Sequence, residues 1–332
     1  MPLIAALFCV WALISSIWSP NSMLSFGRAG TLILLLYIAA LLTIHARHSF
    51  SNPVAAVTSS TLIAMLTGLA LLFLISFLIW DTPFKFGASN TYTGRQGRLI
   101  LAHGGPLDTG EYMALVTVVA ALVLRQYAAK VLITGTLIIL ILLTDSRNLL
   151  VCVPIALAAA WFHRGSSTLR FLVTALFVFG IAVVLILLVS GDLMRLLPHD
   201  LRTLNGRIPL WQFAGRTISE HPLLGVGYYA SRYYLTARFY WAGQTHNAYV
   251  ETLMTTGLIG LALLLVFLAS CAKVSFQSRN ALLTGILVLT CLASIFSPLL
   301  MSSNLYTFLL FVMAILVGES LAAQRIQFQG HQ

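Results

Sequence analysis

Arginine, histidine and tryptophan side chains gather in one polar part of the chain, residues 191–246. It contains the runs Asn205-Gly206-Arg207-Ile208-Pro209-Leu210-Trp211, His221-Pro222-Leu223-Leu224-Gly225-Val226-Gly227 and Thr245-His246-Asn247-Ala248-Tyr249. Arginine holds phosphate oxygens through paired N–H groups and stays charged at any working pH. A neutral imidazole can take a proton from a hydroxyl. These residue types together predict a site for a phosphate-bearing ligand beside a proton-accepting histidine.

A short helix is expected to carry Arg207, the first candidate ligand of phosphate. Asn205 is a suitable N-cap, and Pro209 falls in the first turn, where its missing N–H is tolerated. The helix should run to about Ser219, because His221-Pro222 stops it.

One face of this helix contains Arg207, Trp211, Ala214 and Ile218 at helical spacing. An apolar stripe can therefore rest on a membrane domain while Arg207 projects from one end. Arg216, on the same helix, is a weaker candidate for the same ligand. An interfacial amphipathic helix without any chemistry fits this pattern too.

His246 is the candidate general base. Thr245 or Asn247 can cap the apolar helix that follows, which places His246 at its N-terminus. The helix dipole and the nearby arginines disfavour the imidazolium there, so a neutral ring is expected. The alternative role for a single histidine is a structural hydrogen bond at the membrane interface.

Arg147 is the second candidate phosphate ligand. It lies in Leu143-Thr144-Asp145-Ser146-Arg147-Asn148, a tight turn between two apolar stretches. An arginine near bilayer depth is costly, which favours a functional partner. A local pair with Asp145 would explain it without function.

The elements that position these residues are membrane helices. With 59% hydrophobic and 8% charged residues and a mean hydropathy of +0.93, the chain has the composition of a polytopic membrane protein. Apolar runs predict about ten spans, at 3–18, 29–45, 54–80, 110–124, 131–144, 148–163, 169–190, 247–270, 281–300 and 304–323. The first has no cationic flank and no cleavage site, so a retained helix is expected rather than a signal peptide. The fold class is therefore all-α, polytopic, with one large extracytoplasmic loop that contains short helices.

Charge sets the expected orientation and organisation. Alternate short connectors carry basic residues, and these are retained in the cytoplasm together with both termini. Residues 1–190 then form seven helices with an outer loop at 81–109, residues 191–246 form the large outer loop, and residues 247–332 form the last helices. Eleven of the nineteen Lys and Arg fall on the outer side: Arg28, Lys85, Arg95, Arg98, Arg147, Arg195, Arg202, Arg207, Arg216, Arg232 and Arg238.

This outer excess favours an anionic ligand such as a phospholipid or a lipid-linked diphosphate, although long loops are partly exempt from the insertion rule. Nucleic acid is not expected as a partner on that side. The four cysteines lie in or beside apolar spans, so no disulfide framework is expected. Glycines in 81–109, with His103 among them, suggest an irregular loop, and Gly225-Val226-Gly227 suggests a tight turn or a close backbone approach.

The ordered set of motifs resembles the O-antigen ligase and O-antigen polymerase superfamily. Ser146-Arg147, Gly206 to Trp211, His221 to Gly227, His246-Asn247-Ala248-Tyr249 and Thr256-Gly257-Leu258-Ile259-Gly260 carry the resemblance, and Trp18-Ser19-Pro20 is similar to an early turn of that family. The match is close over about residues 140–265 and rests on topology elsewhere.

The resemblance implies a GT-C-like, inverting, metal-independent glycosyltransferase at the periplasmic face of a bacterial inner membrane. Its donor would be a glycan on a polyprenyl (undecaprenyl) diphosphate, and its acceptor a glycan or lipid-linked hydroxyl, with membrane lipids around it and no cofactor. Arg147 and Arg207 match the family arginines that hold the diphosphate, and His246 matches the family histidine near the acceptor hydroxyl.

Three functions remain open from the sequence. The favoured one is a glycan polymerase or ligase, with polymerase slightly preferred. A transporter or flippase of a lipid-linked anion is the second, and it is disfavoured because no carboxylate relay and no internal repeat are found in the apolar spans. A non-catalytic membrane scaffold is the third.

Overall fold

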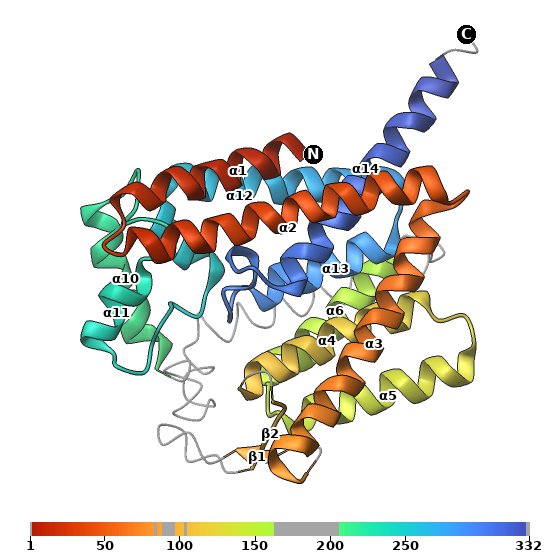
Figure 1. The fold of residues 1–332 in the computed structure, drawn as a ribbon, viewed down its shortest axis with the longest axis horizontal. Coiled ribbons are helices and arrows are strands. Elements are labelled where there is room, and N and C mark those ends of the chain that lie inside the picture. Colours follow the sequence, from red (N-terminus) through yellow and green to blue (C-terminus); the bar gives the residue numbers. More distant parts are fainter. Residues whose placement is uncertain (1, 83–84, 88–96, 103–104, 163–205, 330–332) are drawn as a thin grey trace, which may run out of the picture.

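The structure is a computed structural model that describes residues 2–82, 85–87, 97–102, 105–162 and 206–329. The described chain is almost entirely helical (Figure 1). Its helices are α1 (Pro2–Ser15), η1 (Ser16–Trp18), α2 (Ser22–Ser49), α3 (Pro53–Trp80), α4 (Pro106–Val123), α5 (Tyr127–Leu143), α6 (Arg147–Phe162), α10 (Arg207–Glu220), α11 (Ser231–Arg238), α12 (Ala248–Ser278), α13 (Ala281–Ala293), η2 (Leu299–Met301) and α14 (Leu305–Gln329).

Asparagine defines the start of four of the long helices. The side chains of Asn21, Asn52, Asn247 and Asn280 each accept a hydrogen bond from a first-turn N–H of α2, α3, α12 and α13. Such caps satisfy donors that have no partner inside the helix. The apolar pattern therefore gives each helix its length, and a polar residue fixes where it begins.

The helices form a bundle whose outer surface is apolar. Five described helices, α2, α3, α4, α12 and α14, are long and apolar enough to cross a membrane, while Pro2–Trp18, Tyr127–Leu143, Arg147–Phe162 and Ala281–Ala293 are shorter apolar stretches. Many large side chains on the bundle are exposed, among them Leu3, Leu78 and Leu132, each at about 70%. A surface of this kind is suited to lipid, which agrees with the expected membrane protein.

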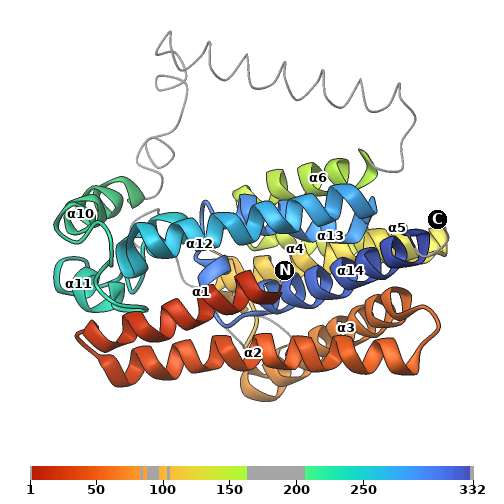
Figure 2. The same cartoon turned by 90° about the horizontal axis from the view of Figure 1, so that it is seen from above.

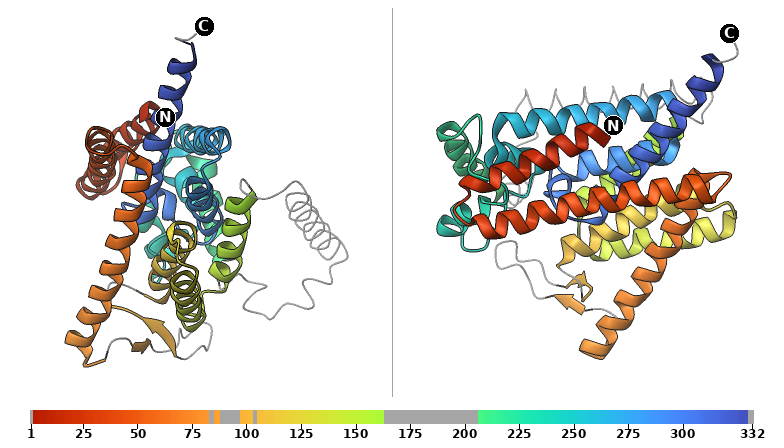
Figure 3. Two further views of the ribbon diagram at one scale, coloured as in Figure 1. Left: turned by 90° about the vertical axis from the view of Figure 1, so that its right-hand side faces the viewer. Right: turned by 45° about the horizontal axis from the view of Figure 1, so that its top comes forward.

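The bundle has two distinct ends. Helices α10 and α11 lie together at one end, beside the turn from α1 to α2 (Figures 1 and 2). The connectors α2–α3, α4–α5 and α12–α13 lie at the other end, where residues next to all three line one cavity of about 610 Å³. Arg125, Lys130 and Arg279 are among its lining residues. Alternate basic connectors therefore share an end, as the sequence predicts, while α14 extends outward from the bundle (Figure 3).

Several predicted boundaries differ from the structure. Helix α2 starts at Ser22, where Asn21 caps it, rather than at 29 as predicted. The prediction starts too late because glycines and Arg28 interrupt the apolar run within the first turns of the helix. Helix α13 ends at Ala293 rather than at 300, because Ser294 and the Ser297-Pro298 pair follow. The predicted span 169–190 lies outside the described residues.

The predicted irregular loop at 81–109 contains a small β-ribbon. Strand β1 (Lys85–Gly87) pairs antiparallel with β2 (Arg98–Ile100), with Phe86 opposite Leu99. Leu99 is fully buried, while Arg98 and Ile100 on either side of it are half-buried, an alternation that is typical of a strand.

A break in α12 ties the loop after α10 to the bundle. Gly257 has φ 68° and ψ −170° within α12. The carbonyls freed by this break accept hydrogen bonds from loop N–H groups: Val226 donates to Met254 (3.0 Å) and Gly227 donates to Thr255 (2.8 Å). The loop therefore replaces the hydrogen bonds that a continuous helix would make.

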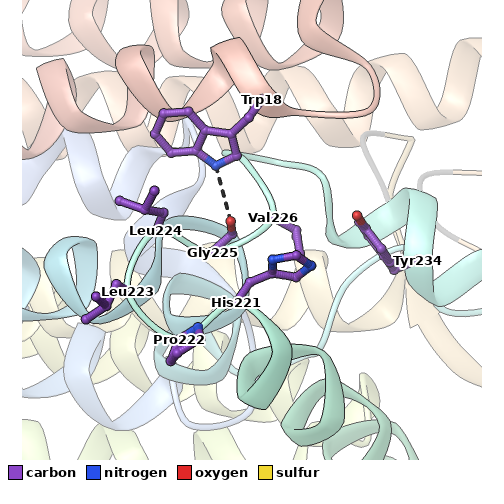
Figure 4. Close-up of a pocket in the computed structure, with 8 residues that line it drawn as sticks. All are labelled: Trp18, His221, Pro222, Leu223, Leu224, Gly225, Val226 and Tyr234. Carbon is purple, nitrogen blue, oxygen red and sulfur yellow. Dashed lines mark hydrogen bonds between the residues drawn. The ribbon is translucent and has the colours of Figure 1, made fainter.

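Glycine is required at these contacts because backbones touch. A Cβ on Gly257 would lie 2.1 Å from the Leu223 carbonyl oxygen, and one on Gly225 would lie 2.5 Å from the Thr255 carbonyl. The predicted close backbone approach at Gly225-Val226-Gly227 is confirmed. The indole N–H of Trp18 donates to the Gly225 carbonyl at 3.2 Å, across a largely apolar cavity of about 440 Å³ (Figure 4). These contacts hold α10 in a fixed position relative to α12.

Candidate functional site

Helix α10 begins at Arg207 and places this residue at the edge of the bundle. Its N-cap is Gly206, in the left-handed region with φ 81°, whereas the predicted cap Asn205 lies outside the described residues. This corrects the predicted cap: glycine adopts that conformation without strain. Pro209 lies in the first turn as expected, and the helix ends at Glu220, one residue past the prediction.

The buried face of α10 is slightly rotated from the predicted stripe. Leu210, Ala214 and Thr217 are buried, while Trp211 and Ile218 are only half-buried. The helix packs against α12 and also against the loop that follows it, in a small apolar cluster with Val226 and Met254 among others. Trp211 is thereby left at the edge, where its indole N–H is free to act as a donor.

Two interactions fix the backbone immediately before His246. The indole N–H of Trp211 donates to the Thr245 carbonyl at 2.9 Å, and the Thr245 N–H donates to Glu251 Oε2 at 2.8 Å. The other carboxylate oxygen of Glu251 accepts from the Ser231 hydroxyl. Arg207 and His246 are therefore held through one rigid chain of contacts that starts on α10 and ends on α12.

His246 has an unusual conformation and environment. Its φ is 54°, a left-handed value that is uncommon for a residue with a side chain. Its ring stacks on Trp241 at 6.3 Å between centroids, and Nδ1 is buried without a hydrogen-bond partner in the described part of the chain. Asn247, and not Thr245, caps α12, with its side chain accepting from the N–H groups of Tyr249 and Val250.

The His246 imidazole is neutral at ordinary pH. Burial lowers its pKa from 6.5 to about 4, and the positive charge of Arg207 contributes a second, smaller effect. The direction agrees with the sequence-based expectation, but the main cause is desolvation rather than the helix dipole. The ring can therefore accept a hydrogen bond or a proton from a hydroxyl.

Arg207 is a partly desolvated cation. Its guanidinium lies over the Phe296 ring at 5.7 Å from the centroid. Burial lowers the pKa of Arg207, the nearby carboxylate of Glu111 opposes this change, and Arg98 adds to it. Arginine still remains charged, because its pKa starts far above neutrality. A cation with little competing solvent binds an anion more strongly than an exposed one does.

Arg147 lies on a turn that packs against the same end of α4. A Cβ on Gly110 would lie 2.8 Å from the hydroxyls of Ser146 and Thr144, so the turn touches the residue next to Glu111. The Arg98 side chain donates to the Thr144 carbonyl at 2.8 Å, and its charge also acts on Arg207.

The side chain of Arg147 is half-exposed, and its Nε lies 3.3 Å from Asp145 Oδ1. The local pair that the sequence allowed is therefore formed, and an exposed pair of this kind is weak enough for a stronger anion to displace.

Arg216 is not brought together with these residues. It is exposed, and nine positions separate it from Arg207, which corresponds to about half a turn around the helix. The cations Arg95, Arg195 and Arg202, together with His103, lie outside the described residues. Among the described residues, Arg207 acts electrostatically on His246, and Arg98 acts on Arg207.

Glu111 is the main site residue that sequence reasoning missed. It lies in the first turns of α4, is 5% exposed, and interacts electrostatically with Arg207. An acidic residue within an apolar span is itself a signal of function, and Glu111 falls inside the predicted span 110–124. Glu251 carries the same signal, but both of its oxygens are occupied by structural hydrogen bonds.

The comparison with known protein families gives a match to part of the chain. Residues 131–265 match the family model described as O-antigen ligase. This segment runs from α5 into α12 and includes Arg147, Arg207, Arg216 and His246. No individual curated protein matches the chain. With the apolar helices, the match makes this a multi-pass bacterial membrane protein. Residues 131–265 of this chain are therefore similar to the O-antigen ligase family, a family of glycan-transferring membrane enzymes.

Proposed function

We propose that this protein is an inverting glycosyltransferase that moves a glycan from undecaprenyl diphosphate to an acceptor hydroxyl at the periplasmic face of the inner membrane. The observation that carries the proposal is the pairing of a partly desolvated Arg207 with the neutral, buried imidazole of His246. A permanent cation stabilises a departing diphosphate, and a neutral imidazole accepts the proton of an attacking hydroxyl.

The reaction follows from these two roles. The acceptor oxygen attacks the anomeric carbon on the face opposite the diphosphate, and the bond from that carbon to the diphosphate oxygen breaks. The bonding pair leaves with the diphosphate, and Arg207 stabilises the negative charge that develops there. Arg147 also binds the diphosphate, after its side chain has separated from Asp145. The acceptor proton passes to His246. Attack from the opposite face inverts the anomeric configuration.

The low pKa of His246 in the free protein is compatible with this role. A base works best when its pKa is near the operating pH. The positive charge of Arg207 is one cause of the low pKa of His246. A diphosphate bound at Arg207 brings negative charge next to the imidazole and offsets this effect. His246 therefore becomes a stronger base when the donor is bound than when the site is empty.

We favour a polymerase over a ligase, and reconstitution separates the remaining functions. The purified protein is placed in liposomes that contain an undecaprenyl-diphosphate-linked glycan, with or without a separate lipid acceptor. A polymerase lengthens the glycan on its carrier, and a ligase forms product only with the second lipid. Movement of the donor across the bilayer without a new glycosidic bond would identify a transporter instead, and no effect at all would identify a scaffold.

A further inference from the structure

A cavity lined by both polar and apolar side chains lies beside the proposed diphosphate site. It is formed by the start of α4 and the connector between α13 and α14, and it has a volume of about 340 Å³, within the range of small-molecule sites. Its lining includes Asp108, Glu111, Gln244, Ser297, Asn304 and Tyr306. Side chains with carboxylate, amide and hydroxyl groups are the ones that hydrogen-bond the hydroxyls of a sugar.

One lining group has an unused acceptor. The Ser297 hydroxyl hydrogen-bonds the Glu111 carboxylate, yet Glu111 Oε1 is buried and has no hydrogen-bond partner among the residues that the structure describes. A buried carboxylate oxygen without a donor is costly. By contrast, Asn304 is occupied internally, since its amide donates to Leu299 and its oxygen accepts from Thr307.

The position of Glu111 relates the cavity to the reaction. The carboxylate interacts electrostatically with Arg207, and Gln244 lies two residues before His246 in the chain. The cavity is therefore next to the arginine that holds the diphosphate and next to the segment that carries the base. The part of the donor closest to a bound diphosphate is its first sugar.

We propose that this cavity holds the first sugar of the donor and that Glu111 Oε1 accepts a hydrogen bond from a hydroxyl or acetamido N–H of that sugar. Oε1 is buried. The Glu111 side chain therefore has to rotate toward the cavity for Oε1 to reach the sugar. This assignment rests on the proposed function. It makes Glu111 a sugar-binding residue that distinguishes a glycosylated carrier from the bare one.

The test compares the affinities of the full-length protein, in lipid nanodiscs, for two kinds of ligand. One is undecaprenyl diphosphate, and the other is undecaprenyl diphosphate carrying a single N-acetylglucosamine, N-acetylgalactosamine or galactose. The wild type should bind at least one glycosylated lipid about tenfold more tightly than the bare lipid, as expected for one additional hydrogen bond. Glu111→Gln and Glu111→Leu should bring this ratio close to one. The loss of a carboxylate beside Arg207 should by itself change the affinities for bare and glycosylated lipid alike and so leave the ratio unaffected.

Two further variants keep the result interpretable. Asp108→Asn removes a carboxylate from the exposed rim of the same cavity and should keep the tenfold ratio. Ser297→Ala removes the group that orients Glu111 and should lower the ratio partly, which gives a second reading if the Glu111 variants fold poorly. A wild type that binds no form of the carrier would refute the proposed function. Binding of all the lipids with equal affinity, or a ratio that persists in the folded Glu111 variants, would overturn the sugar site alone.

Discussion

The pKa of His246 gives the most specific prediction of the structure. Its value of about 4, against 6.5 for an ordinary histidine, means that at pH 5.5 only about 3% of the rings are protonated rather than about 90%. The difference corresponds to at most about 3.4 kcal/mol against the imidazolium. We therefore expect kcat/KM, which reports the free enzyme, to stay level from pH 8 down to about pH 5.5 and to fall by half only near pH 4.

The same titration can be observed directly by NMR of protein labelled with ¹³C-histidine, with His246→Gln used to assign the resonance. Arg207→Gln should raise the pKa of His246, because it removes the second cause of the shift, but not to 6.5, because burial is the larger cause. Since the folded-state pKa is depressed, the stability that the neutral ring contributes is complete above about pH 6.5 and is lost as the pH falls toward 4. A wild-type resonance that titrates near 6.5, or one that Arg207→Gln leaves unmoved, would refute the assigned environment.

Three further outcomes are expected. Arg207→Lys should lower kcat about 10- to 100-fold although the charge is kept, because an ammonium does not hold a diphosphate as a planar guanidinium does. The control Arg238→Lys should leave kcat nearly unchanged in the same transfer assay. Equal effects of the two substitutions would indicate a diffuse electrostatic role. Gly257→Ala should destabilise the protein by about 2 to 4 kcal/mol and reduce activity, because Gly257 has a positive φ and touches the loop before it. The control Gly215→Ala, at which a Cβ meets open space, should be neutral or slightly stabilising in thermal unfolding. Similar unfolding temperatures for the two variants would contradict the role given to the break in α12. Arg147→Cys should react with an impermeant thiol reagent added from the periplasmic side of oriented membranes, and labelling only from the cytoplasmic side would separate Arg147 from the site.

Several helices could be predicted from the sequence because an apolar run follows a polar start, as in α2, α3, α12 and α13. Asn247 and Pro209 act where local rules place them, as a cap and a first-turn proline. The break at Gly257 was not foreseen, since Thr256-Gly257 sits inside an apolar run that is compatible with a continuous helix. It depends on a loop 30 residues earlier that supplies the missing hydrogen bonds, for example from Val226 to Met254, and such a partner is invisible to a local pattern.

The sequence predicts what kind of ligand the site binds, but not the full set of residues that form it. Arginine and histidine signalled a phosphate ligand and a base, and the structure brings Arg207 next to His246. The sequence predicts Arg216 as a second ligand because it shares a helix with Arg207, but the rotation along the helix between them directs Arg216 to a different face. No local pattern relates Glu111 to Arg207, because these two electrostatically interacting residues are almost one hundred positions apart in the chain. Only the packing of α4 against the neighbouring elements reveals that pair.

We propose that His246 and Arg207 together transfer a glycan from a diphosphate carrier. The most direct measurement counts the undecaprenyl diphosphate released and the glycosidic bonds formed by wild type and His246→Ala in proteoliposomes, with a metal chelator present. We expect one carrier released for each bond in the wild type, and a rate about 10²- to 10⁴-fold lower in His246→Ala while its affinity for the donor is retained. Near-native turnover by purified His246→Ala, or a wild-type reaction that stops with the chelator, would contradict the account.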